Sequence, residues 1–311
     1  MASYSIVICT YNGQKTISQA IDAILALHLY NTHVKEVLIV DNASTDNTKK
    51  IIEDYIRKNS KIKYIYESKP GLSHARRRAV EANGDWVIYV DDDNILDQHW
   101  LDVLEKVIVA HPDVGVINGA VIAVPTDVLS LEEECRLSLM YRNLACTHIG
   151  SIDYPAKENK NPMGAGMCIP THVLREISQE GWLDLLGRTG ENLSSGEDTE
   201  LCNKVFGKGY TYICDYRMRM QHLIPKSRLS QKNVDRLLEG LITSRYQLIS
   251  SQRYYLLKRI ARGVKYVLVY LCACFPTKDN WKNECRREKK VVSKVFIKCL
   301  TNDKLFCRKF G

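Results

Sequence analysis

The stretch Val87-Ile88-Tyr89-Val90-Asp91-Asp92-Asp93 runs from four residues of high β-propensity directly into three carboxylates. Gly84-Asp85 before it supplies a turn signal. Because side chains alternate along a strand, we expect Asp91 and Asp93 to share one face and Asp92 to lie on the other. Adjacent anions repel unless a cation or hydrogen-bond donors neutralise them, and hard divalent cations prefer carboxylate oxygens. The cluster therefore predicts a divalent metal site at a strand end, and a solvated acidic turn is the alternative.

The composition is that of a globular protein with an uneven charge distribution. The chain has 311 residues, 26% of them charged, and a formal net charge of +8. This length suits one large or two ordinary domains. The acidic clusters lie in the first two thirds, and the region after Lys226 is rich in Lys and Arg. Such a basic region favours an anionic surface such as phospholipid or nucleic acid, and a solvated basic face is the alternative.

The cysteines and the first residues bear on the compartment. There are 11 cysteines with no CxxC pair, and only Cys272 and Cys274 lie close together in sequence. This pattern argues against both a zinc site and the disulfide framework of a secreted protein, and it favours a reducing compartment. Met1-Ala2-Ser3 leads directly into a strand-like run, so we expect no signal peptide and a cytoplasmic protein.

The first hundred residues alternate between apolar strand-like runs and amphipathic helical segments. We expect strands over 4–9, 37–40, 62–66 and 87–90, and helices over 16–29, 48–58, 73–82 and 101–110. Continuous apolar strands that alternate with helices indicate a parallel sheet covered on both faces. Further along, we expect strand structure over 114–124 and 210–214, and helices around 131–144, 199–206 and 234–247. The fold class is therefore α/β.

Polar side chains follow these strands: Thr10-Tyr11-Asn12, then Asp41 with Asp46, then the three aspartates. The carboxyl ends of strands in a doubly wound sheet converge on one crevice, where ligands bind. Neither GxGxxG nor GxxxxGK[ST] occurs at any strand-to-helix turn, which disfavours a dinucleotide dehydrogenase and a P-loop NTPase.

Four stretches in this order resemble the motif set of family 2 glycosyltransferases, which are inverting enzymes with the GT-A fold. They are Val7-Ile8-Cys9-Thr10-Tyr11-Asn12, Val40-Asp41-Asn42-Ala43-Ser44-Thr45-Asp46, Gly71-Leu72-Ser73-His74-Ala75-Arg76 and Val90-Asp91-Asp92-Asp93. The resemblance implies a mostly parallel, Rossmann-like sheet with a helical C-terminal extension.

The resemblance also implies a binding site for a nucleotide-sugar. Tyr11 would flank the base, and Asp41 would accept a hydrogen bond from it. Arg76 would neutralise the diphosphate, for which a guanidinium is suited. The full set of implied donor-binding residues is Thr10, Tyr11, Asn12, Asp41, Ser44, Arg76, Asp91, Asp92, Gly164 and Gly166. An interface-packing aromatic at Tyr11, a solvated Arg76 and a purely structural turn at the two glycines remain the alternatives.

The metal and catalytic residues follow from the same resemblance. Asp91 and Asp93 form the DxD signature, which would hold ribose and a Mn²⁺ or Mg²⁺ ion, and His222 would be an additional metal or diphosphate contact. Glu197-Asp198 stands at an expected helix start, where the helix dipole stabilises carboxylates. A plain helix start is the alternative, but the pair matches the family's Glu-Asp motif, in which the aspartate is the catalytic base. We therefore assign Asp198 and Glu197 as catalytic.

The C-terminal region differs in character. We expect a catalytic domain over 1–227, with a nucleotide-binding half to about 125 and an acceptor half over 126–227, and a basic helical extension over 228–311. The apolar run 266–275 is too short to span a bilayer, which takes about 20 residues. With Lys258, Arg259, Arg262 and Lys265 beside it, it suits an interfacial helix, or else a core helix. Residues 282–309 are expected to be a basic, partly ordered tail.

The resemblance implies transfer of a sugar from a nucleoside diphosphate sugar, with a UDP-sugar as the expected donor, to an acceptor hydroxyl. The acceptor would be a glycan or a lipid-linked molecule in surface polysaccharide synthesis, and nucleic acid is not an expected partner. Peripheral attachment to the inner face of the cell membrane would follow from the basic extension. A nucleotidyltransferase that forms sugar nucleotides and a non-catalytic binding module of the same fold stay open as alternatives.

Overall fold

The computed structural model describes residues 1–149, 163–185, 187–189, 193, 195–250 and 280–301. The chain divides into two compact units. Unit 1 comprises Met1–Val124, Leu144–Gly190 and Glu197–Ile224, and unit 2 comprises Pro125–Asn143, Glu191–Gly196 and Pro225–Gly311. Unit 1 ends at Ile224, and Pro125–Asn143 and Glu191–Gly196, which lie inside the expected catalytic domain, group with unit 2.

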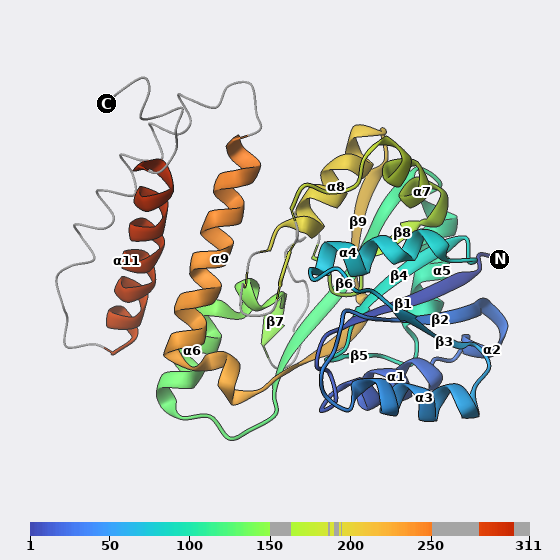
Figure 1. Cartoon of the computed structure of the whole chain (residues 1–311), viewed down its shortest axis with the longest axis horizontal. Coiled ribbons are helices and arrows are strands. Elements are labelled where there is room, and N and C mark those ends of the chain that lie inside the picture. The colour runs from blue at the N-terminus through green and yellow to red at the C-terminus, as the bar shows by residue number, and fades with distance from the viewer. Residues whose placement is uncertain (150–162, 186, 190–192, 194, 251–279, 302–311) are drawn as a thin grey trace. The chain divides into compact units, whose positions relative to one another are not determined.

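Unit 1 is built on one mixed sheet with the strand order β3-β2-β1-β4-β8-β6-β9-β5, to which β7 adds beside β6 (Figure 1). The strands are β1 (Tyr4–Thr10), β2 (Val34–Asp41), β3 (Ile62–Tyr66), β4 (Trp86–Asp91), β5 (Asn94–Leu96), β6 (Val114–Pro125), β7 (His148–Ile149), β8 (Cys168–Pro170) and β9 (Thr211–Ile224). The first four strands in the order are parallel, and β8 pairs antiparallel with β4. The predicted α/β fold with a mostly parallel N-terminal sheet is confirmed.

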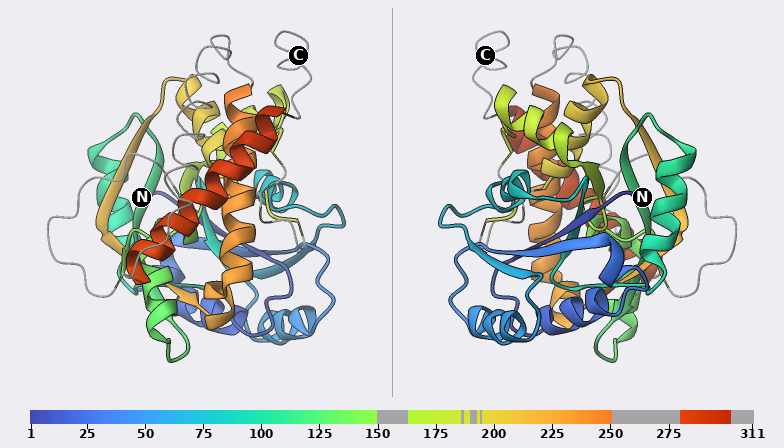
Figure 2. Two further views of the ribbon diagram at one scale, coloured as in Figure 1. Left: turned by 90° about the vertical axis from the view of Figure 1, so that its left-hand side faces the viewer. Right: turned by 90° about the vertical axis from the view of Figure 1, so that its right-hand side faces the viewer.

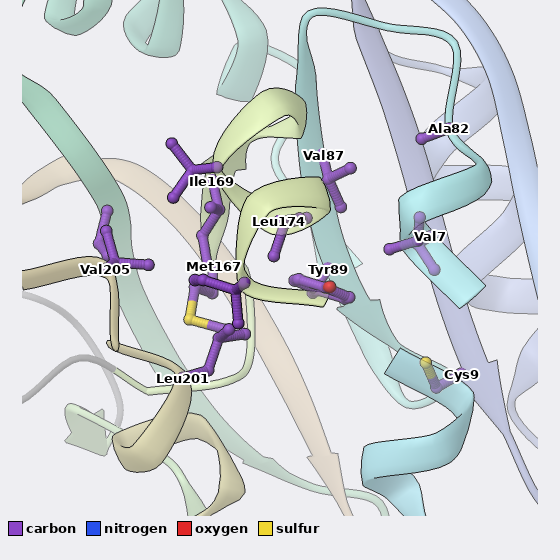
Figure 3. Packing of buried hydrophobic residues seen from close by; sticks show 14 of the residues in the cluster. Val7, Cys9, Ala82, Val87, Tyr89, Met167, Ile169, Leu174, Leu201 and Val205 are labelled. Carbon is purple, nitrogen blue, oxygen red and sulfur yellow. The ribbon is translucent and has the colours of Figure 1, made fainter. Parts of the chain in front are cut away.

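Helices cover both faces of this sheet. In unit 1 they are α1 (Ile17–Leu25), α2 (Tyr30–His33), α3 (Thr48–Lys58), α4 (Leu72–Arg77), η1 (Arg78–Glu81), α5 (Trp100–Ala110), α7 (Thr171–Glu180) and α8 (Glu197–Gly207). One apolar cluster joins β1, β4 and β8 to α4, α7 and α8; Val7, Tyr89, Met167, Leu174 and Leu201 are among its members (Figure 3). All seven residues of β1 are buried, as a strand covered on both faces requires.

Unit 2 is helical, with α6 (Leu131–Met140), η2 (Tyr141–Leu144), η3 (Lys226–Leu229), α9 (Gln231–Ser250) and α11 (Asn280–Thr301). Helices α9 and α11, orange and red, lie side by side in the views of Figures 1 and 2. An ion pair links them between Asp235 and Arg287 at 3.3 Å. Among the helices described, none combines the length and apolarity needed to cross a bilayer. The run 266–275 lies outside the described residues.

Several predicted elements have different lengths. The strand expected over 210–214 continues to Ile224, because charged residues such as Arg217 and Arg219 alternate with buried Met218 and Met220. The expected tail over 282–309 is helical as far as Thr301. The helix expected over 16–29 ends at Leu25, and the one expected over 73–82 becomes a 3-10 helix after Arg77.

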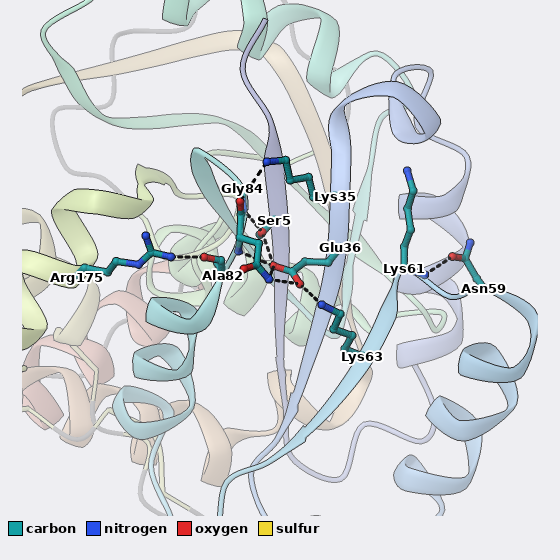
Figure 4. Close-up of polar contacts among 10 residues, drawn as sticks. Ser5, Lys35, Glu36, Asn59, Lys61, Lys63, Ala82, Gly84 and Arg175 are labelled. Atoms are coloured by element: carbon teal, nitrogen blue, oxygen red, sulfur yellow. Dashed lines mark hydrogen bonds and ion pairs between the residues drawn. The ribbon is translucent and has the colours of Figure 1, made fainter.

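A buried polar contact holds the amino ends of the parallel strands together (Figure 4). Glu36 on β2 is 1% exposed and accepts hydrogen bonds from Ser5 Oγ at 2.9 Å, from Lys63 Nζ at 2.6 Å and from the amide nitrogen of Asn83 at 2.6 Å. Burial alone raises the pKa of Glu36, but the hydrogen bonds from Lys63, Asn83 and Ser5 outweigh it and hold the pKa below its ordinary value.

Glu36→Gln should lower the free energy of unfolding at pH 7 by about 1–3 kcal/mol, because charge-assisted hydrogen bonds are lost. A carboxylate whose pKa is depressed in the folded state stabilises the fold above its unfolded pKa, and that stability is lost as the pH falls through the folded value. The difference in free energy of unfolding between wild type and Glu36→Gln, measured in urea, should therefore become smaller as the pH is lowered. Glu53→Gln, on the exposed face of α3, is the control; an equal effect of both substitutions would contradict this role.

Candidate active site at the carboxyl ends of the parallel strands

The strand register brings the polar strand ends together. Thr10 pairs with Asp41 across β1 and β2, and Cys9 pairs with Asp91 across β1 and β4. The predicted convergence of the first three motifs on one edge of the sheet is therefore present in the structure. Because these strands are parallel, the loops that follow them also lie beside one another.

The loops after β1 and β2 are interlocked by hydrogen bonds. Asn12 has a left-handed backbone with φ 56°; its amide donates to Ser44 Oγ at 2.9 Å, and its side-chain oxygen accepts from the Thr45 amide at 2.8 Å. Asn and Asp tolerate this conformation better than other non-glycine residues. Tyr11, beside it, is 49% exposed. The loop thus fixes its own backbone while presenting an aromatic ring to solvent.

Asp41 is buried and is held by two donors. Its Oδ1 accepts from the Ser44 amide at 2.8 Å, and its Oδ2 accepts from Tyr64 Oη at 2.8 Å. Each carboxylate oxygen can accept a second hydrogen bond. A contact to a nucleotide base remains a prediction for Asp41, and Tyr64, which sequence reasoning missed, orients that carboxylate.

The three aspartates do not continue a strand as expected. β4 ends at Asp91, and Asp92 and Asp93 form the turn into β5, so strand alternation does not set their directions. Asp92 Oδ2 accepts from Thr10 Oγ1 at 2.5 Å. A Cβ at Gly13 would overlap both of these groups, which explains the glycine there.

Asp93 turns into the protein and meets His222. Asp93 is 5% exposed; its Oδ2 lies 3.3 Å from His222 Nε2, and its Oδ1 accepts from Asn94 Nδ2 at 3.2 Å. His222 is opposite Asn94 in the antiparallel pair of β5 and β9, and its Nδ1 lies 3.5 Å from Cys146 Sγ. The structure thus joins two members of the predicted metal set. Across the described residues, Asp91, Asp93 and His222 do not come close enough to form a three-ligand cluster.

Arg76 forms a buried ion pair with Glu197. The Arg76 Nη1 to Glu197 Oε1 distance is 2.8 Å, and both side chains are 4% exposed. The guanidinium also lies over the ring of Tyr89, whose hydroxyl donates to the Arg76 carbonyl oxygen at 3.1 Å. The alternative of a solvated arginine is therefore wrong for Arg76, whereas its neighbour Arg77 is exposed.

The electrostatics of this pair follow from burial and from the surrounding carboxylates. Burial by itself lowers the pKa of Arg76, but Glu197, Asp91 and Asp198 outweigh it and raise that pKa, so the guanidinium stays charged. Burial raises the pKa of Glu197, with Arg76 opposing this shift. Glu197 Oε2 accepts no hydrogen bond from the described part of the chain. The site therefore contains a fixed internal cation flanked by carboxylates from β4 and α8.

Asp198 lies in the first turn of α8 and is less buried than Glu197. Its Oδ2 accepts from the Gly164 amide at 3.1 Å, and its Oδ1 accepts from the Thr199 amide at 2.7 Å. A Cβ at Gly164 would overlap the guanidinium of Arg76. Gly164 thus contacts both the Arg76–Glu197 ion pair and Asp198.

Asn118, on β6, holds the segment that carries Gly164. Asn118 is fully buried, and its Nδ2 donates to the carbonyl oxygens of Met163 at 2.9 Å and Ala165 at 2.8 Å. Sequence reasoning missed this residue, although a lone amide within the apolar run 114–124 was a usable signal. Gly166 has φ 67° and packs against Trp100 and Met220, so its geometry is that of a tight turn.

The fold of this chain is that of GT-A glycosyltransferases. The mannosyltransferase PcManGT from Pyrobaculum calidifontis, solved with GDP-Man and Mn²⁺, superposes with a TM-score of 0.60 over 99% of this chain and 88% of that one, at 16% identity. Staphylococcus aureus TarS 1–349 with UDP superposes with a TM-score of 0.51 over 94% and 90% of the two chains, also at 16% identity.

The sequence comparisons find similarity in the N-terminal part of the chain. Residues 5–143 match the model of glycosyl transferase family 2. The cholesterol galactosyltransferase of Borreliella burgdorferi is 34% identical over 101 residues, which are 32% of this chain and 27% of that protein. The poly(ribitol-phosphate) β-N-acetylglucosaminyltransferase TarS of S. aureus is 31% identical over 121 residues, 38% of this chain and 21% of that protein. The N-terminal part of this chain is thus similar to glycosyl transferase family 2.

Arg76→Met should lower the free energy of unfolding by about 3–5 kcal/mol, because it leaves Glu197 buried without a partner. Replacing both partners, in Arg76→Met/Glu197→Met, should recover much of that loss, since the uncompensated charge is gone. Guanidinium chloride unfolding measures all three proteins. The exposed neighbour Arg77→Met is the matched control and should stay within about 0.5 kcal/mol of wild type; an Arg76→Met variant as stable as this control would contradict the pairing.

Proposed function

We propose that this chain transfers a sugar from a nucleoside diphosphate sugar to an acceptor hydroxyl with inversion at the anomeric carbon. The observation that carries this proposal is that Asp91 at the end of β4, Arg76 on α4 and Asp198 on α8 lie at one edge of the sheet, where Gly164 contacts both Arg76 and Asp198. A donor bound at the strand ends would have its diphosphate near the first two groups and its sugar toward the third.

Asp198 is the group best placed to act as a general base. Two backbone amides orient its carboxylate, and it is not sealed in the core as Glu197 is. It would accept the proton of the acceptor hydroxyl while that oxygen bonds to the anomeric carbon. The bond from that carbon to the diphosphate oxygen breaks in the same displacement, and the configuration inverts. Glu197, paired with Arg76, would position the neighbouring base.

The donor set at the DxD turn fits Mn²⁺ or Mg²⁺. Hard cations prefer carboxylate oxygens, and Asp91 offers a carboxylate that accepts no hydrogen bond from the described residues. Asp91 would hold the ion, and Asp93, which contacts His222 in this structure, would have to turn toward Asp91 to join it. When bound, the metal would stabilise charge on the departing diphosphate. The proposed donor is a UDP-sugar, and the structures of TarS 1–349 with UDP and with UDP-GlcNAc and of PcManGT with GDP-Man support a nucleotide-sugar.

Asp198→Asn should reduce transfer by about 10²–10⁴-fold while nucleotide affinity stays near the wild-type value, since a general base acts on the acceptor. Product formation from a panel of UDP- and GDP-sugars gives the rate, and calorimetry gives the affinity for UDP. Asp113→Asn, at an exposed position, is the matched control. Turnover of Asp198→Asn at the wild-type rate would require another base, and formation of a sugar nucleotide from a sugar phosphate would indicate a nucleotidyltransferase instead.

Removal of divalent metal should weaken binding of the nucleoside diphosphate. Calorimetry of UDP with Mn²⁺ and with EDTA measures this, and Asp91→Asn should reduce the difference between the two conditions. Equal UDP affinity in Mn²⁺ and in EDTA would exclude the metal role at the DxD turn, and the Asp198 experiment would stay independent of that result.

The acceptor is proposed to be a glycan or a lipid-linked molecule at the inner face of the cell membrane, with unit 2 as the membrane contact. In unit 2, α11 exposes Arg287, Lys289, Lys290 and Lys294. Basic residues near an anionic surface contribute about 1 kcal/mol each, and salt screens this attraction.

Flotation with anionic liposomes should therefore carry the protein upward at low salt and less of it at high salt, while neutral liposomes should carry little. Lys289→Glu/Lys294→Glu should reduce flotation, whereas the same reversal at Lys49 and Lys50, two lysines on α3 of unit 1, is the control. A protein that remains at the bottom with both kinds of liposome would contradict the membrane contact.

A further inference from the structure

Two histidines and an aspartate form a compact cluster away from the DxD turn. His28 lies between α1 and α2, His99 directly precedes α5, and Asp102 lies in the first turn of α5. His28 Nδ1 is 2.9 Å from Asp102 Oδ1, and His99 Nδ1 is 3.0 Å from Asp102 Oδ2. A backbone hydrogen bond from the His28 amide to the Gln98 carbonyl oxygen, at 2.9 Å, holds the two segments together.

This cluster belongs to the amino-terminal side of the sheet. One turn further along α5, Glu105 Oε1 accepts a hydrogen bond from the hydroxyl of Tyr4 at 2.7 Å, and Tyr4 is the first residue of β1. The candidate active site follows the last residues of β1 and β4. The glycosyltransferase chemistry proposed above therefore has no use for His28, His99 or Asp102.

The geometry of the cluster suits a metal ion. One ligand atom from each residue lies within 4.8 Å of the other two, and this is the one such group of three among the residues that the structure describes. The side chains of His28 and His99 are 63% and 59% exposed, so an ion from solvent can reach them and keep water ligands.

The ligand types decide which ion fits. Two imidazole nitrogens with one carboxylate oxygen favour Zn²⁺ and similar late transition metals over Mg²⁺ and Mn²⁺, which prefer oxygen ligands. The pattern of cysteines argued against a zinc site, but this set contains no cysteine. From these contacts we infer that His28, His99 and Asp102 bind a Zn²⁺ ion, which would join the connection between α1 and α2 to the start of α5.

The inference is tested on the full-length chain with Zn²⁺ itself as the probe. Competition with a fluorescent zinc indicator, in buffer with excess Mg²⁺, gives the affinity and the stoichiometry. We expect one site whose affinity falls by about tenfold or more in His28→Gln/His99→Gln, because even second-shell changes at zinc sites cost 10–100-fold. His111→Gln, at an exposed histidine outside the cluster, should bind like wild type.

Asp91→Asn/Asp93→Asn separates this site from the DxD turn and should keep the same Zn²⁺ affinity. Co²⁺ provides a second readout, since visible absorption bands should appear in wild type and be absent in His28→Gln/His99→Gln. Circular dichroism without metal checks that this variant folds, which its exposed positions favour. Absence of Zn²⁺ binding in wild type, unchanged affinity in His28→Gln/His99→Gln, or loss of binding in Asp91→Asn/Asp93→Asn would each overturn the inference.

Discussion

A guanidinium buried among carboxylates is the interaction on which the candidate site depends. Arg76 comes from α4 and its partner Glu197 from α8. Asp91, whose charge also raises the pKa of Arg76, comes from β4. Removing a charged pair from water is costly, and close geometry is required to offset that cost. Since no single element supplies all these groups, the pair forms only when the parallel strands, α4 and α8 are all in place. Site geometry is thereby tied to completion of the fold.

This constraint gives the two adjacent acidic residues of α8 different roles. Glu197 is sealed in the core against Arg76, and Asp198 is partly exposed and held by the amides of Gly164 and Thr199. In the proposed mechanism, this difference in environment would give Glu197 a structural role and Asp198 a chemical one. Gly164 contributes to both environments: its amide donates a hydrogen bond to Asp198, and its lack of a side chain leaves room for Arg76.

The sequence predicted the N-terminal half of the sheet well, because apolar strands and amphipathic helices leave strong local patterns. The runs at β1, β2, β3 and β4 and the polar residues after them lie where these patterns indicated. The turn at Asp92-Asp93 and the helical state of residues 282–301 depend on tertiary pairing, which local pattern does not report. The burial of Arg76 could likewise not be predicted from the sequence, because its partner Glu197 lies 121 residues away.

Many of the motif residues that suggest ligand binding are bonded to one another. Asn12 binds Ser44 and Thr45, Thr10 binds Asp92, and Asn42 accepts from the Gly71 amide at 2.9 Å. These motif residues therefore hold four loops together by hydrogen bonds, in addition to the donor contacts proposed for some of them. Preorganised loops are what a transferase needs, because positioning of reactants supplies much of the catalytic effect. Under the proposed function, substitutions at these hydrogen-bonded residues would alter loop geometry and donor binding together. Exposed Tyr11 and the Asp91 carboxylate are the positions at which the two roles can be separated, since neither side chain holds a loop.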